Sequence, residues 1–268
     1  SVAIGFDALA GLTTGGSNVA IGKNAYKIGT ASNNVYIGYD AGNAANTGIN
    51  QVGIGASAGN SNTGANSISI GNFSNRTNTA ASTISIGHLA GFSNTSGLEN
   101  TNSGFEAGYS NTTNSSRTCI GYNAGKGSTG AWNTLVGAYA GRLTTGAGNT
   151  AIGRNALLNN TSGGSNVALG HEAGNTTSTG NTNTFIGTAS GRQNSSGSAN
   201  AALGHEALRA NLGSNNTGLG FRAGNAITTG SNLTVVGYDA DASSATATNE
   251  ITLGDANVDL LRIPGLGS

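Results

Sequence analysis

The stretch Asn149-Thr150-Ala151-Ile152-Gly153 is followed 17 residues later by Asn166-Val167-Ala168-Leu169-Gly170. The shared pattern, apolar-x-apolar-Gly, recurs along the whole chain, and successive glycines lie 16 or 17 residues apart. Self-similarity at one fixed period is the sequence signature of a repeat architecture. We call these glycines the anchor glycines: Gly5, Gly22, Gly38, Gly55, Gly71, Gly87, Gly104, Gly121, Gly137, Gly153, Gly170, Gly187, Gly204, Gly220, Gly237 and Gly254.

Each anchor glycine follows a short segment typical of a β-strand. A large aliphatic residue such as Ile152 precedes the glycine, and two places earlier stands Val, Ile or Thr. Residues two apart lie on one face of a strand, and β-branched side chains suit that surface. We expect this pair to face the interior of the coil. The residue between them, apolar in Tyr36, Leu135 and Phe185, is then expected to point outward.

The rest of each repeat is rich in residues that favour turns and in Asn at a fixed position. Asn most often stands four places before the anchor glycine, and Ala nearly always three places after it. Many repeats carry a second Thr-Gly or Ser-Gly turn seven residues before the next anchor, as at Gly146. Two turns per repeat predict two short strands per coil. Stacked coils would align the Asn side chains in a hydrogen-bonded ladder.

The predicted fold is therefore an all-β parallel β-solenoid, or β-roll, of 16 coils of 16–17 residues. We assign residues 1–254 to the solenoid and residues 255–268 to a C-terminal exit segment that leads to a removed or missing domain. At ~4.8 Å per coil the rod would be roughly 75 Å long. Each coil has few apolar residues for its core and further apolar residues that are expected to point outward. We therefore predict a homotrimeric fibre in which other copies of the chain bury these outward residues.

Composition excludes several classes of function. The net charge is zero and only 8% of residues are charged, which disfavours nucleic-acid binding. No apolar run approaches the length of a membrane span. Cys119 is the single cysteine, so an intrachain disulfide is impossible. The chain begins without Met, inside a repeat at Ser1, and we interpret it as part of a longer protein.

The Ser/Asn-x-Val-Ala-Ile-Gly motif at residues 1–5 and 18–22 resembles the heads of trimeric autotransporter adhesins, which are trimers of parallel β-rolls. The coil of that family is shorter and lacks the Thr-Gly insertion. The last stretch, Asn249 to Asp255 and then Val258 to Ile263, is similar to the segment before self-cleaving chaperone domains in phage tail fibres and tailspikes. These resemblances imply a trimeric fibre with a role in attachment.

Residues that could take part in catalysis or ligand binding follow the repeat and do not form clusters. Gly53-Ile54-Gly55 and Gly218-Leu219-Gly220 lack the G-x-G-x-x-G pattern of nucleotide loops. The three histidines and the acids are spread over different coils, without the spacing of a metal or catalytic site. We predict no catalytic residues, no metal site and no cofactor, and hence no enzyme activity.

The position directly after the anchor glycine is aromatic or His in nine coils, although only 5% of residues are aromatic. These rings either cover the turns or form an exposed stripe that contacts a sugar or receptor. The receptor-stripe candidates are Phe6, Tyr39, His88, Phe105, Tyr122, His171, His205, Phe221 and Tyr238.

The leading functional hypothesis is a structural and host-attachment segment of a phage tail fibre or tailspike, located on the virion. A bacterial trimeric adhesin head, extracellular or on the cell surface, is the alternative, and an ice-binding solenoid is the second alternative. A homotrimer is the expected assembly, with host-cell surface polysaccharide or a receptor as partner. Ser103 replaces the aliphatic residue of the seventh repeat, with Asn102 beside it, so we expect that coil to be weak.

Overall fold

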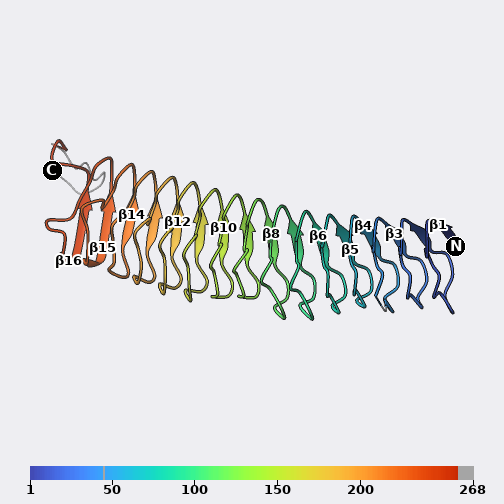
Figure 1. Ribbon diagram of the computed structural model, residues 1–268. Coiled ribbons are helices and arrows are strands. Elements are labelled where there is room, and N and C mark those ends of the chain that lie inside the picture. Colours follow the sequence, from blue (N-terminus) through green and yellow to red (C-terminus); the bar gives the residue numbers. More distant parts are fainter. Residues whose placement is uncertain (45, 259–268) are drawn as a thin grey trace, which may run out of the picture.

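The computed structural model describes residues 1–44 and 46–258, which form the predicted parallel β-solenoid (Figure 1). One strand per coil contributes to a single 16-stranded sheet, and the strands follow one another in chain order. The strands are β1 (Val2–Ile4), β2 (Val19–Ile21), β3 (Val35–Ile37), β4 (Val52–Ile54), β5 (Ile68–Ile70), β6 (Ile84–Ile86), β7 (Thr101–Ser103), β8 (Thr118–Ile120), β9 (Thr134–Val136), β10 (Thr150–Ile152), β11 (Val167–Leu169), β12 (Thr184–Ile186), β13 (Ala201–Leu203), β14 (Thr217–Leu219), β15 (Ser231–Val236) and β16 (Thr248–Leu253). We number the coils like their strands.

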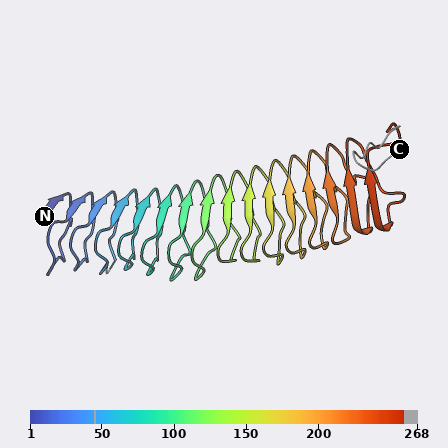
Figure 2. The same cartoon turned by 180° about the vertical axis from the view of Figure 1, so that it is seen from behind.

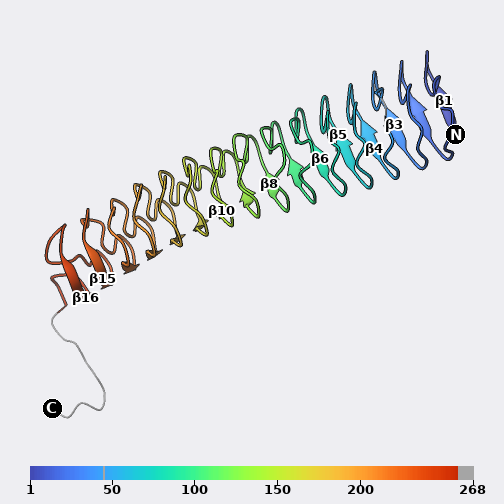
Figure 3. The same ribbon diagram turned by 90° about the horizontal axis from the view of Figure 1, so that it is seen from below.

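Neighbouring strands pair in parallel with the repeat in register. Thr150, Ala151 and Ile152 lie beside Val167, Ala168 and Leu169 of the next coil. The strands form one row along a side of the rod (Figure 2). Seen from below, the coils succeed each other along one axis, with β1 and β16 at opposite ends (Figure 3). The predicted exit segment, residues 255–268, lies largely outside the described residues.

The prediction of two strands per coil is wrong. Beyond the strand, the described chain runs in turns and bends, with one isolated bridge between Gly29 and Asn46. Backbone hydrogen bonds still join successive coils there, such as Gly125 N–H to the Ala140 carbonyl at 2.9 Å. The second residue after most anchor glycines has a positive φ, 55° at Asn123, and such left-handed residues interrupt an extended strand.

The predicted orientation of the strand side chains is also wrong. The middle residue points into the coil, where Leu135 and Phe185 are fully buried, whereas the flanking pair points outward and Ile120 is 40% exposed. The alternation of side chains along a strand determines which residues share a face, but it does not determine which of the two faces points into the coil. The lumen of the coil is narrow, so one side chain per strand fits where two β-branched ones would not.

Side chains from two walls share this narrow lumen. Where the strand contributes a large middle residue, glycine stands four places after the anchor on the opposite wall: a Cβ on Gly42 would lie 2.6 Å from the Tyr36 ring. Where the opposite wall carries the large residue, the strand is small, as with buried Leu157 and Ala151. A close-packed interior requires this kind of compensation in volume.

The predicted Asn ladder is confirmed. The backbone N–H of Asn166 donates to Oδ1 of Asn149 at 3.0 Å, and Nδ2 of Asn149 donates to the Gly163 carbonyl at 3.0 Å. Each ladder amide thus satisfies backbone groups of its own coil and the next. These groups would otherwise be buried without partners.

The position of Ser103 differs from the prediction. Ser103 belongs to the outer pair and is half-buried, whereas Asn102 is 2% exposed and lies inside the coil. Asn102 Nδ2 donates to Ser85 Oγ at 3.3 Å, so this part of the lumen is polar and hydrogen-bonded. Ser103 therefore leaves no gap in the core of coil 7.

Replacement of an anchor glycine tests the coil spacing. Gly121 has a φ of 130°, and a Cβ there would lie 2.7 Å from the carbonyl carbon and oxygen of Gly137. We expect Gly121→Ala to lower the free energy of unfolding by at least the ~1–3 kcal/mol of one strained residue, measured by chemical denaturation. Gly16→Ala is the control, because no atom lies within 4 Å of a Cβ at Gly16. Equal stability of the two variants would contradict the close approach of the coils.

Candidate functional site

The anchor glycines direct the residue that follows them to the surface. All nine receptor-stripe candidates are exposed, from 41% for Phe105 and Phe221 to 71% for Phe6 among the aromatic members. Because the coils are in register, the nine residues occupy equivalent places along the rod. Exposure and alignment are both preconditions for an interaction surface.

Six of the nine rings form two stacks of three. His88, Phe105 and Tyr122 stack with 5.3 Å between successive ring centroids and interplanar angles of 10° and 12°. His205, Phe221 and Tyr238 stack in the same way at 5.1 and 5.2 Å. The centroid distance lies close to the ~4.8 Å between strands, so the stacking follows from the coil spacing.

Neighbouring turn positions add aromatic residues that the sequence analysis missed. Phe92 and Tyr109 stack at 5.1 Å, and Tyr139 meets Tyr122 edge-on at 5.3 Å. The guanidinium of Arg76 lies 5.7 Å from the ring of Phe92. These residues occur two and five places after the anchor glycine, and the same repeat alignment could have revealed them. We call the two stacks and these neighbours the ring surface: His88, Phe92, Phe105, Tyr109, Tyr122, Tyr139, His205, Phe221 and Tyr238.

Charged residues beside the ring surface are paired from coil to coil. Lys126 contacts Glu106 at 2.6 Å, and Arg222 lies 3.2 Å from Asp239 and 3.9 Å from Glu206. The pairs are partly exposed, so each contributes only about 0–1 kcal/mol to stability. Their main effect is to place hydrogen-bonding groups next to flat apolar rings, an arrangement that suits carbohydrate recognition.

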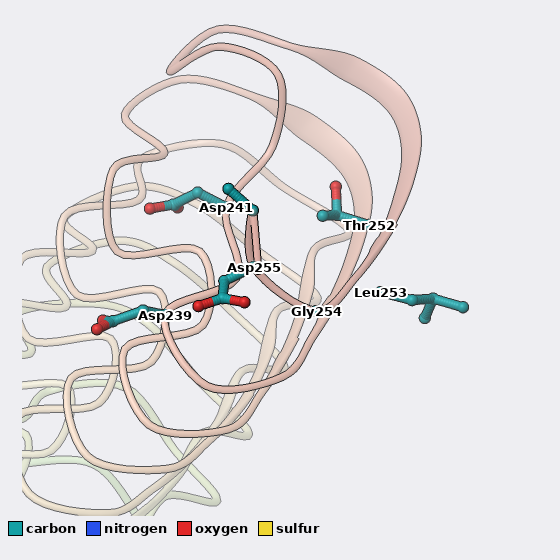
Figure 4. Close-up of a pocket in the computed structure, with 7 residues that line it drawn as sticks. Asp239, Asp241, Thr252, Leu253, Gly254 and Asp255 are labelled. Carbon is teal, nitrogen blue, oxygen red and sulfur yellow. The ribbon is translucent and has the colours of Figure 1, made fainter. Parts of the chain in front are cut away.

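A pocket lies at the carboxyl end of the solenoid. Figure 4 shows Asp239, Asp241 and Asp255 on one side of the chain and Leu253 pointing the opposite way. Burial raises the pKa of Asp241, while hydrogen bonds from Asn257 lower the pKa of Asp255. Within residues 1–44 and 46–258, no cluster of three or more His, Cys, Asp or Glu side chains could hold a metal ion.

The outer face of the sheet is a second candidate surface. It consists of the two outward columns, with Thr or an aliphatic residue in one and an aliphatic residue in the other in every coil except coil 7. Leu203 is 48% and Leu219 43% exposed, and between β12 and β14 the small Ala201 leaves a shallow apolar groove. Contiguous apolar surface of this extent is typical of an interaction site.

The described chain contains no helix that is long and apolar enough to cross a membrane. Comparison with models of protein families, with curated proteins and with solved structures finds no match to this chain.

Proposed function

We propose that the chain is a segment of a homotrimeric attachment fibre, in which the outer sheet face joins the copies and the ring surface contacts the host. The main support for this proposal is the apolar character of the outer sheet face. It runs through all 16 coils and, with one exception, presents an aliphatic side chain at each. The proposal includes no catalytic role.

The dimensions of the outer sheet face suit other copies of the chain. Sixteen coils at ~4.8 Å and a width of about 10 Å give roughly 750 Å² of outer sheet face per chain, which a trimer divides between two neighbours, against the ~800 Å² per partner of one standard stable interface. A partner must present apolar groups at the same axial spacing over the same length. A second solenoid of the same kind satisfies this condition, and the resemblance to trimeric β-roll fibres supports three copies.

The ring surface supports attachment through sugars. Flat stacked rings flanked by Arg222 and its carboxylate partners can pack against the apolar face of a sugar and bond its hydroxyl groups. A phage tail fibre or tailspike remains the first candidate and a bacterial adhesin head the alternative. Ice binding finds less support, because Thr is confined to one of the two outward columns.

A charge on the outer sheet face should separate the copies. We expect Leu203→Asp to convert the trimer to monomers in light scattering, because three carboxylates would be buried in an apolar interface. Ser196→Asp is the matched control, since Ser196 is exposed near the second turn of a neighbouring coil. An unchanged mass for Leu203→Asp would exclude this face as the interface.

Ser103 offers a gain-of-stability test of the same interface. If copies cover the outer sheet face, Ser103→Ile buries one more aliphatic side chain per chain. The free energy of unfolding should then rise by about 1.5–3 kcal/mol per chain. Ser196→Ile, which lies off this face, should give no such gain. If the face is open to water, thermal denaturation will show no increase for Ser103→Ile either.

Removal of exposed rings tests attachment. We expect the combined replacement by Ala of Tyr122 and Tyr238 of the ring surface and of Tyr39, a further receptor-stripe candidate, to reduce binding to host-cell surface polysaccharide and to preserve the trimer. Stacking on a ring is commonly worth about 1–3 kcal/mol, so the loss of three rings should be evident in a cell-binding assay. Unchanged binding by an intact trimer would show that these tyrosines serve only the structure.

A further inference from the structure

A single arginine interrupts the Asn ladder inside the solenoid. Arg117 occupies the ladder position of coil 8, between Asn100 of coil 7 and Asn133 of coil 9. It is 1% exposed and is the largest of the fully buried side chains. Its backbone N–H donates to Asn100 Oδ1 at 3.1 Å, as a ladder residue does. The register of the coils therefore directs a cationic side chain into the lumen.

The guanidinium of Arg117 presents hydrogen-bond donors that lack acceptors. Among the described residues, neither Nε nor Nη1 has a hydrogen-bond partner, and Nη2 has only Cys119 Sγ at 3.7 Å. Ser128 Oγ is also buried without a partner. The register places Ser128 next to Arg117, because the equivalent residues of coil 13, Asn211 and Asn200, are hydrogen-bonded at 3.1 Å.

No protein group supplies the opposite charge. Arginine stays protonated in proteins, and an unpaired buried charge is strongly destabilising. None of the buried residues of the described chain is Asp or Glu. The acids closest in sequence face outward, where Glu106 pairs with Lys126 and Glu99 accepts a hydrogen bond from Ser116. Burial also raises the pKa of the Cys119 thiol, which keeps it neutral near pH 7.

The lumen of coil 8 is lined by small side chains. Cys119 stands at the strand position and Gly125 opposite it, and these small residues make room for the Arg117 side chain: a Cβ on Gly125 would lie 2.7 Å from Cys119 Sγ and 3.3 Å from Arg117 Nη2. Leu135 of coil 9 provides an apolar wall beside the guanidinium, since it and Arg117 both lie against Gly125. An electrostatic contact is stronger in such a low-dielectric place than in water.

We propose that coil 8 encloses a small monovalent anion of the halide class, held by the guanidinium of Arg117 and by the Ser128 hydroxyl. Because Arg117 is 1% exposed and lies between coils 7 and 9, the ion enters as the chain folds. The anion offsets the single buried cation and allows the ladder to continue past Arg117.

Denaturation of the whole chain at constant ionic strength tests the site, with sodium bromide replacing sodium gluconate stepwise. We expect the midpoint for the wild-type chain to rise with bromide concentration, because an anion that binds only the folded state stabilises it. Arg117→Asn should fold, since an Asn there can reach the carbonyls of Asn114 and Gly130 as Asn100 reaches those of Gly97 and Asn114. Its midpoint should not respond to bromide.

Arg192→Asn is the control, because Arg192 lies at the surface beside Glu172 and its loss should leave the bromide response intact. A crystal of the wild-type chain grown in bromide should in addition show anomalous density inside coil 8. Equal bromide responses of the wild type and Arg117→Asn, or water without anomalous signal beside Arg117, would overturn the proposal.

Discussion

The structure depends on one constraint: each residue must lie directly on its counterpart in the next coil, at the distance of a β-sheet hydrogen bond. The anchor glycines make this approach possible, because a Cβ on Gly121 would collide with the backbone of Gly137. The Asn ladder then satisfies the buried backbone groups that the strand does not reach, as Asn149 does for Gly163. The same spacing stacks exposed rings such as Phe105 and Tyr122.

A narrow lumen follows from this constraint and determines the character of both faces. With Ala or Gly on the wall opposite the strand, only one side chain per strand fits inside, such as Leu135 or Phe185. The pair that flanks the middle residue of each strand is forced to the outside, where the sheet alone cannot bury its aliphatic members. From coil to coil, a large side chain on one wall of the lumen is matched by a small one on the other. In coil 8 the lumen contains a charged side chain, Arg117. The apolar outer sheet face and the narrow, closely packed interior thus have one cause.

The period of the sequence was sufficient to predict the solenoid, the coil length, the Asn ladder and the alignment of the ring residues. It was not sufficient to place the strand pair, because the alternation of Thr150, Ala151 and Ile152 is the same whichever face is inside. The second predicted strand failed because residues such as Asn123 adopt a left-handed conformation without being glycine. The repeat alignment could have shown that Phe92 and Tyr109 occupy equivalent positions, but the burial of Arg117 required the structure, because the sequence did not show that the ladder position points into the lumen.

In the proposed fibre, other copies lie side by side with the chain and cover the outer sheet face. Small-angle X-ray scattering of the purified chain tests this arrangement most directly, because one measurement gives both the mass and the largest dimension of the particle. We expect a mass three times the 26.1 kDa of one chain, with a length still near the roughly 75 Å of one solenoid. A particle of 26.1 kDa, or one whose length grows in proportion to its mass, would contradict this arrangement.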